Sequence, residues 1–111
     1  MSVTPVFFPR EPRTSCALYG WLLLAEDRLL PIFIGNLSAG GCMGEIDDSV
    51  RTSTAVGVSI TNAGVFPGKV RWARYGRVGI SFRRRLPVHV FDELIESAGR
   101  CAKRDVLLAN P

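Results

Sequence analysis

Two groups of residues in this chain have types and spacings suited to binding an anionic ligand. The first is the pattern Asn36-x-Ser38-x-x-Gly41, which follows a run of alternating large apolar residues. Asn and Ser side chains hydrogen-bond their own backbone in turns, and glycine reaches backbone conformations closed to other residues. The pattern therefore predicts a turn that carries its polar residues and presents amide donors to an anion. The second group is the arginine pair Arg10 and Arg13.

The charge balance also favours an anionic partner. The 111 residues include 14 Lys and Arg against 10 Asp and Glu, a formal net charge of +4, and the excess lies in the arginine pair and in residues 69–85. The planar guanidinium of arginine pairs with phosphate oxygens or with guanine O6 and N7, and its face stacks on a base. This clustering favours a phosphate-bearing ligand over a charge that only solubilises the protein.

The sequence carries no pattern typical of catalysis. His89 is the only histidine, it follows a proline at the start of an expected helix, and its spacing pairs it with no serine or cysteine. GxGxxG, P-loop and HExxH motifs are absent from the sequence. The carboxylates that could bind a metal or act in pairs are interpreted as solvated charges: Asp47, Asp48, Asp92, Glu93 and Glu96. We therefore predict a binding protein, not an enzyme, with no catalytic residue and no metal site.

The cysteines and the hydropathy pattern indicate the expected cellular location. Cys16, Cys42 and Cys101 are an odd number without CxxC spacing, which argues against a disulfide framework or a zinc knuckle and favours reduced, mostly buried thiols. The first residues hold no apolar run typical of a signal peptide, and the apolar stretch 18–34 is interrupted by charges at 26–28. Neither half reaches the roughly 20 residues that span a bilayer. The expectation is a cytoplasmic protein without membrane insertion.

Short apolar runs separated by turn signals predict a small antiparallel barrel. The expected strands are residues 15–24, 29–37, 41–46, 55–60, 65–75 and 77–82, with turns at 25–28 and at Tyr75-Gly76. In the fifth strand, side-chain alternation with a period of two places Val70 and Trp72 on one face and Arg71 on the opposite face.

A helix should follow the strands. Pro87 is suited to the first turn of a helix, and apolar residues at Val88, Phe91, Leu94, Ile95 and Ala98 follow helical spacing. The polar residues of the opposite face are Asp92, Glu93, Glu96, Arg100 and Lys103. The chain, 1–111, is thus predicted to be one domain with an extended N-terminal arm (1–13), a β-barrel (14–83), a C-terminal helix (87–104) and a tail (105–111).

The combined motifs resemble those of the PilZ domain family, bacterial receptors for cyclic di-GMP. That family carries an RxxxR motif in its N-terminal segment and a [D/N]xSxxG motif after the second strand. Here the arginine pair, the pattern at 36–41 and the VRWARYGRVGISF segment at 70–82 carry a resemblance that covers nearly the whole chain. It implies an all-β fold with a C-terminal helix, namely a six-stranded antiparallel PilZ-type β-barrel capped by one α-helix.

The resemblance also implies a ligand and its contacts. With cyclic di-GMP as the ligand, Arg10 and Arg13 would contact phosphate and guanine. Asn36 and Ser38 would make polar contacts with a base and a phosphate, and Gly41 would allow close backbone approach. Trp72 is a further candidate, as an aromatic neighbour of the bound base.

Two positions depart from the commonest family pattern. Arg10-Glu-Pro-Arg13 is RxxR, one residue shorter than RxxxR, and Pro9 stands four residues before Arg13. In an extended chain one residue changes the side on which a side chain emerges, so this spacing alters the direction of the first arginine unless the proline twists the arm back. Asn36 in place of aspartate removes a negative charge and keeps an acceptor, which the family pattern permits.

Three functions follow as hypotheses. The first is a stand-alone cyclic di-GMP receptor that relays the second messenger to a protein partner in motility, pilus or exopolysaccharide and biofilm control. The second is a degenerate adaptor that binds a protein partner without cyclic di-GMP, using Phe7, Phe8 and the outer helix face. The third is a small basic barrel that binds RNA or single-stranded DNA. Its contacts would be Arg71, Arg74, Arg77 and residues 83–85, with Trp72 or Tyr75 stacking on bases.

Overall fold

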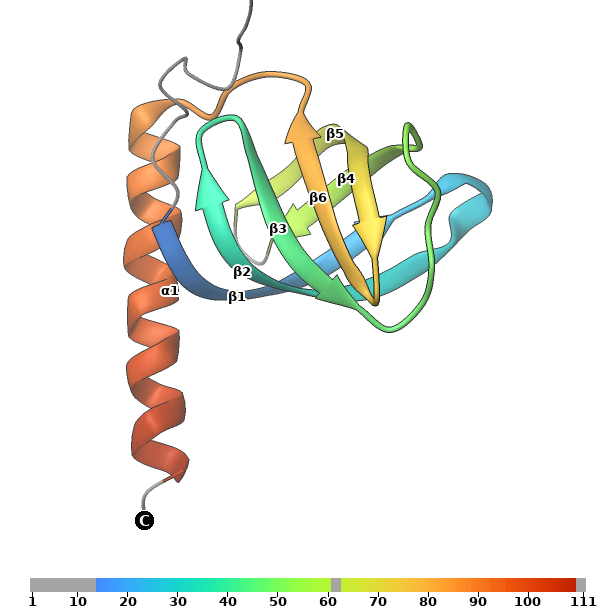
Figure 1. The fold of residues 1–111 in the computed structure, drawn as a ribbon. Helices are drawn as coiled ribbons and strands as arrows, with labels where there is room; N and C mark the ends of the chain where they lie inside the picture. Colours follow the sequence, from blue (N-terminus) through green and yellow to red (C-terminus); the bar gives the residue numbers. More distant parts are fainter. Residues whose placement is uncertain (1–13, 61–62, 110–111) are drawn as a thin grey trace, which may run out of the picture.

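Six antiparallel strands close into a barrel, and one helix caps it (Figure 1). The computed structural model describes the backbone of residues 14–60 and 63–109 and the side chains of those up to Ala98. The elements are β1 (Thr14–Leu23), a 3-10 turn (Ala25–Asp27), β2 (Leu29–Ser38), β3 (Gly41–Ile46), β4 (Ala55–Ile60), β5 (Gly64–Arg74), β6 (Arg77–Phe82) and α1 (Val88–Ala109). The order around the barrel is β1-β2-β3-β6-β5-β4, closed by pairing of β1 with β4. The predicted fold class is confirmed, and the predicted arm at 1–13 lies outside the described residues.

Alternating apolar side chains fill the barrel. On β4, for example, Val56, Val58 and Ile60 point inward and are buried, while Gly57 and Ser59 between them are not. The inward residues of all six strands form one buried cluster together with Leu94 and Ala98 of α1. Alternating residues of a strand point to opposite faces, so one face of each strand faces the core and the other remains on the outside of the barrel.

The strand register shifts in β1 between Ser15 and Leu18, in β2 and in β5, and the shifts in β2 and β5 are β-bulges that decide which pocket residues face outward. One lies at Gly35 in β2, where Ile34 pairs with Gly44 but Asn36 pairs with Met43. The other lies at Arg71 in β5. An extra residue on one strand of a pair shifts the phase of every side chain beyond it. Each bulge therefore moves the following residues to the face opposite the one that simple alternation predicts.

The β5 bulge corrects one expectation. Val70 is fully buried and pairs with Ile80, whereas Trp72 is partly exposed and pairs with Gly79. The prediction that Val70 and Trp72 share a face was wrong, because the unpaired Arg71 between them reverses the alternation. Trp72 consequently lies on the outside of the barrel.

The helix is longer than predicted. It runs from Val88 to Ala109 rather than ending at 104, so residues 105–109 are helical and not a tail. This extension contains Val, Leu and Ala and no Gly or Pro, so nothing in it stops a helix. At the other end Val88 is 75% exposed, although it fits the apolar spacing, because the helix first meets the core with Val90 and Phe91.

Candidate functional site

An open pocket of about 550 Å³ lies on the outside of the barrel, where β2, β3, β6 and β5 run side by side. Its lining residues are Asn36, Leu37, Ser38, Gly40, Gly41, Cys42, Met43, Arg71, Trp72, Gly79, Ile80, Ser81 and Arg85. The volume is within the range of about 300–1,000 Å³ typical of sites for small molecules. Four of the six predicted ligand-binding residues meet here, while Arg10 and Arg13 lie outside the described residues.

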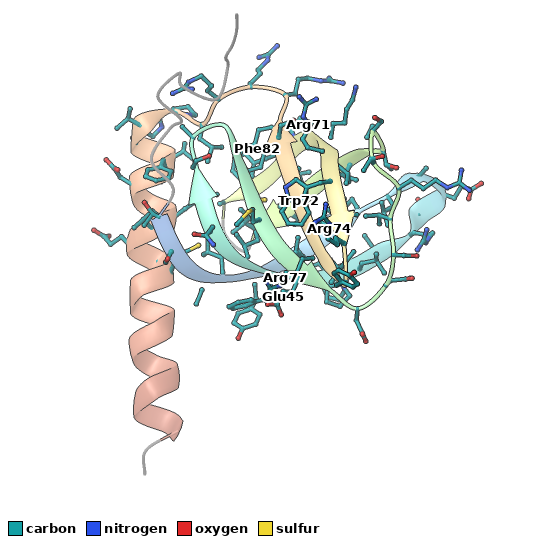
Figure 2. All side chains as sticks on the ribbon, in the orientation of Figure 1. Glu45, Arg71, Trp72, Arg74, Arg77 and Phe82 are labelled. Atoms are coloured by element: carbon teal, nitrogen blue, oxygen red, sulfur yellow. The ribbon has the colours of Figure 1, made fainter. Side chains whose placement is uncertain are left out.

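Strand register explains why residues distant in sequence meet in this pocket. One row across the four strands runs from Asn36 to Met43, Gly79 and Trp72. The neighbouring row runs from Ser38 to Gly41, Ser81 and Lys69. Three of the four middle positions in these rows are glycine or serine, namely Gly79, Gly41 and Ser81, and the fourth is Met43, so small residues leave a hollow between the taller side chains. Figure 2 shows Arg71, Trp72 and Arg74 following one another along β5 at one side of this surface.

The turn predicted from the pattern at 36–41 begins later in the chain than expected. Asn36 and Ser38 belong to β2 itself, and the two-residue turn that follows is Ala39-Gly40. Neither Gly40 nor Gly41 has a positive φ, so this turn does not use the conformational freedom of glycine. The Gly35 bulge instead directs Asn36 and Ser38 outward and Leu37 into the core, where it is fully buried.

The polar groups of the pocket have room for a ligand. The Ser38 hydroxyl donates to the Gly41 carbonyl oxygen at 3.3 Å, and its lone pairs remain as acceptors. Among the described residues, no group hydrogen-bonds to the side-chain amide of Asn36, which is partly buried. A partly buried amide without a protein partner gains from a ligand that supplies one.

Two glycines shape the pocket by lacking a side chain. A Cβ on Gly41 would overlap the backbone carbonyl of Ile80 on β6, so glycine is required for β3 and β6 to approach. A Cβ on Gly79 would overlap the indole ring of Trp72, which therefore lies against the backbone of β6. The first glycine serves strand packing, and the second lets an aromatic ring form one wall of the pocket.

The pocket is electropositive. Arg71 and Arg85 line it and are exposed, and the lining residues that the structure describes include no Asp or Glu. The ion pair found within the described part of the chain joins Arg28 and Asp48 at 3.1 Å, and neither residue lines this pocket. Two guanidinium groups in one pocket favour an anion by direct attraction.

The structure adds pocket residues that the binding-site prediction did not include. Met43 and Ser81 carried no sequence signal, because they reach the pocket only through strand register. Arg71 and Arg85 stood out only as part of the basic segment considered for nucleic acids. The Gly35 bulge had a signal, since an isolated glycine within a strand often marks one.

A second hollow of about 700 Å³ adjoins the first and is lined by Trp72, Arg74, Tyr75 and Arg77. It lies at the β5–β6 turn, where Tyr75 is 96% exposed. Both hollows include Trp72, so the basic and aromatic surface continues along β5. The residues of the nucleic-acid hypothesis at 71–77 thus lie next to the predicted ligand pocket.

Cys42 and His89 lie in different surroundings within the described part of the chain. Cys42 lines the pocket, but burial, with a smaller effect of Cys16, raises the pKa of its thiol to about 12, so it is a neutral thiol at neutral pH. His89 is exposed at the start of α1. In residues 14–60 and 63–98 no three His, Cys, Asp or Glu side chains are grouped as metal ligands would be.

Comparison with known proteins identifies the family. The family model described as "PilZ domain" matches residues 9–98, a range that includes both the arginine pair and the pattern at 36–41. The chain belongs to the PilZ domain family. PilZ domains are binding and adaptor domains, so membership agrees with the prediction of a binding protein.

A solved PilZ structure shares this fold. It is the PilZ domain with cyclic di-GMP of YcgR from Escherichia coli, which is 19% identical, with 87% of this chain and 95% of that chain covered and a TM-score of 0.58. A comparison with curated proteins gave no match. Within the described residues, no helix of this PilZ domain has the length and apolar character needed to cross a membrane.

Proposed function

We propose that this PilZ domain is a receptor for cyclic di-GMP and that the pocket across β2, β3, β6 and β5 is its binding site. The observation that carries the proposal is the convergence of Asn36, Ser38, Gly41 and Trp72 with two arginines in one pocket, whose described lining residues include no Asp or Glu. The ligand joins two guanines and two phosphates, and the pocket offers an amide, a hydroxyl, an indole face and guanidinium groups. Each of these groups suits one part of that ligand.

Different pocket residues contact different parts of the ligand in this proposal. Asn36 and Ser38 hydrogen-bond a guanine edge and a phosphate oxygen, and Arg71 supplies a positive charge to the phosphates. Trp72 stacks on a base, since its ring lies over Gly79 on the pocket wall. The outward direction of Asn36 and Trp72 depends on the two bulges, which act here as bulges often do beside binding sites.

Chain connectivity supports a part for the two N-terminal arginines. β1 begins at Thr14, which pairs with Leu37, and Ser15 pairs with Asn36. Arg13 is bonded to Thr14, so their Cα atoms are about 3.8 Å apart. The partner of Thr14 is Leu37, which stands between Asn36 and Ser38 on β2. Arg10 is separated from Thr14 by at most about 14 Å of extended chain. Chain connectivity therefore allows both arginines to approach the proposed site.

Ligand contacts with both the arm and the barrel provide a signal. A nucleotide held by residues of both parts binds best when the arm lies against the barrel, and it shifts the population to that state. A protein partner that recognises the closed state would then read the nucleotide concentration. Control of motility, pilus function or exopolysaccharide production is the cellular context we propose for this relay.

The shortened arginine spacing favours one alternative, an adaptor that binds its partner without nucleotide. In that case partner capture is independent of cyclic di-GMP, and the contact residues include Phe7 and Phe8, which lie outside the described residues. The adaptor hypothesis predicts the same partner affinity with and without nucleotide. The receptor hypothesis predicts a difference.

Isothermal titration with cyclic di-GMP, with GTP as the control ligand, tests the proposal. We expect saturable binding to the wild type and a loss of about tenfold or more in Asn36→Ala and Arg13→Ala, because each removes a hydrogen-bonding group from a largely polar site. Arg28→Ala is the matched control, since Arg28 pairs with Asp48 away from the pocket. Unchanged affinity in both site variants would contradict the assignment of the site.

A further inference from the structure

A different part of the barrel surface is apolar where a solvent-facing surface is usually polar. The outward residues of β1 and β2 pair as Tyr19 with Phe33, Trp21 with Pro31, and Leu23 with Leu29. All three cross-strand pairs are apolar, although the inner face of the same strands already fills the core. Tyr19, Trp21 and Leu29 are 60%, 49% and 56% exposed. We call these six residues the β1–β2 apolar face.

The β1–β2 apolar face extends onto the neighbouring strand. Ser59 of β4 pairs with Trp21 on one side and with Val65 of β5 on the other, and Val65 is 54% exposed. Exposed apolar residues that stand alone need no explanation, but a contiguous set on a small domain marks a site of interaction. The barrel is closed, so a partner cannot add a strand here and must contact side chains.

Carboxylates border the aromatic part of this face. A pocket of about 540 Å³ is lined by Tyr19, Gly20, Trp21, Pro31, Ile32, Phe33, Glu45, Ile46 and Asp47. Glu45 pairs with Phe33 across β2 and β3, so its carboxylate stands beside an aromatic ring. On its other side Glu45 pairs with Arg77 of β6, but no ion pair joins these two described side chains. The rings of Tyr19 and Phe33 have centroids 5.1 Å apart and are tilted by 54°. In the described part of the chain, no Lys or Arg lines this pocket.

Aromatic faces beside carboxylates are suited to a cation with an apolar stem. The ring faces attract a positive charge, the carboxylates pair with it, and the apolar walls contact the methylene groups. Arginine and lysine side chains have this character. The two carboxylates among the described lining residues have the charge opposite to the chain's net charge of +4, so they favour a basic segment as the occupant of this pocket.

We propose that the β1–β2 apolar face, with Glu45 and Asp47, is the docking site for a partner-protein segment that combines apolar residues with arginine or lysine. A second copy of this chain fits less well. A two-fold contact between identical faces would bring the same carboxylates together, and a contact with the basic surface at 71–77 would not close.

The proposed docking site adjoins the nucleotide pocket without depending on it. On β2, Phe33 of the docking site lies three residues before Asn36 of the nucleotide pocket. On β3, Glu45 of the docking site lies two residues after Met43 of the nucleotide pocket. Three residues along a strand span about 10 Å. Partner and nucleotide would therefore bind to neighbouring parts of β2 and β3.

A labelled peptide of alternating leucine and arginine, measured by fluorescence anisotropy, tests the docking site on the full chain. We expect saturable binding, and no comparable binding of the leucine–glutamate peptide. The double variant Glu45→Gln, Asp47→Asn should weaken binding of the arginine peptide by about fivefold or more, because it removes both carboxylates and keeps the shape of the pocket. Trp21→Ala should weaken it further.

The matched control is the double variant Asp92→Asn, Glu93→Gln, which removes the same charge from exposed positions on α1. It should bind the arginine peptide as the wild type does. Equal losses in the two double variants would show unspecific charge attraction and overturn the proposal, as would absence of binding. If light scattering showed a dimer of the wild type that Trp21→Ala dissociates, the occupant of this face would be a second copy of the chain. That result would also overturn the proposal. Titration of the Glu45→Gln, Asp47→Asn variant with cyclic di-GMP distinguishes a failure of the docking proposal from a failure of the nucleotide proposal, because neither substituted residue lines the nucleotide pocket.

Discussion

At the scale of single residues, the absence of a side chain at Gly79 matters as much as the presence of Trp72. The indole ring occupies the space that a Cβ at position 79 would take. An aromatic residue on the outside of a barrel is usually free to point into solvent. Here the bare backbone of β6 gives the ring a surface to lie on, so one face remains available for a base.

Gly79→Ala should displace Trp72 and weaken binding of cyclic di-GMP by about tenfold, since stacking contributes about 1–3 kcal/mol per base. Titration calorimetry measures the effect. Gly57→Ala on β4 is the control, because its new methyl group would meet the Val65 side chain at 3.0 Å and lies away from the nucleotide pocket. Wild-type affinity in Gly79→Ala would exclude Trp72 from the site.

The buried thiols predict a loss of stability at high pH. Burial raises the pKa of Cys42 from 9.0 to about 12 and that of Cys16 from 9.0 to about 11. In the unfolded chain these thiols ionise near their ordinary pKa of 9.0. The contribution of the neutral thiols to the free energy of unfolding is therefore complete below pH 9, and it decreases as the pH rises from there through the pKa values of the folded protein.

Urea unfolding of the wild type and Cys42→Ala at several pH values measures this effect. Groups other than Cys42 titrate in both proteins, so their effects cancel in the difference. The free energy of unfolding of the wild type should approach that of Cys42→Ala as the pH rises above 9. A difference that stays constant with pH would contradict a buried, neutral Cys42 thiol.

At the scale of elements, the β5–β6 hairpin has a turn that its sequence does not favour. Tyr75 and Gly76 have φ values of 53° and 77°, as in a type I′ turn, in which Asn-Gly is the preferred pair. Tyrosine in the left-handed region costs roughly 1–2 kcal/mol, and Tyr75 is 96% exposed and so gains little from packing.

Tyr75→Asn should therefore raise the free energy of unfolding by about 1 kcal/mol. Tyr75→Val should lower it, because β-branched residues fit positive φ poorly. Urea unfolding of the three proteins gives the comparison. If Tyr75→Asn were less stable than the wild type, the exposed ring would have a stabilising contact that outweighs the turn.

The elements also show how far sequence reasoning reaches. Short apolar runs and turn residues located all six strands to within one residue at each end, because each strand fills the core with apolar side chains and is bounded by a turn. The Arg71 bulge has no signal in the sequence, and it reversed the predicted direction of Trp72. The helix extends past 104 because helix formers continue there without a stop signal. A periodic rule cannot include an extra residue that tertiary pairing accommodates.

At the scale of the whole molecule, the candidate site combines residues from four strands. A local motif was enough to find Asn36, Ser38 and Gly41, because they are close together in the chain. Arg71 and Arg85 enter the pocket only when the barrel closes and brings β5 and the segment after β6 beside β2 and β3. The fold converts a dispersed excess of arginine into one basic pocket, with an acidic and aromatic pocket next to it.

The most direct test of the account is a titration of isotope-labelled protein with cyclic di-GMP, followed by amide and indole NMR signals. The account predicts saturable shifts at Asn36, Ser38, Gly41 and Gly79 and at the Trp72 indole N–H, with the Trp21 indole N–H unmoved. Shifts confined to the β1–β2 apolar face, or no shift at saturating ligand, would contradict the receptor site.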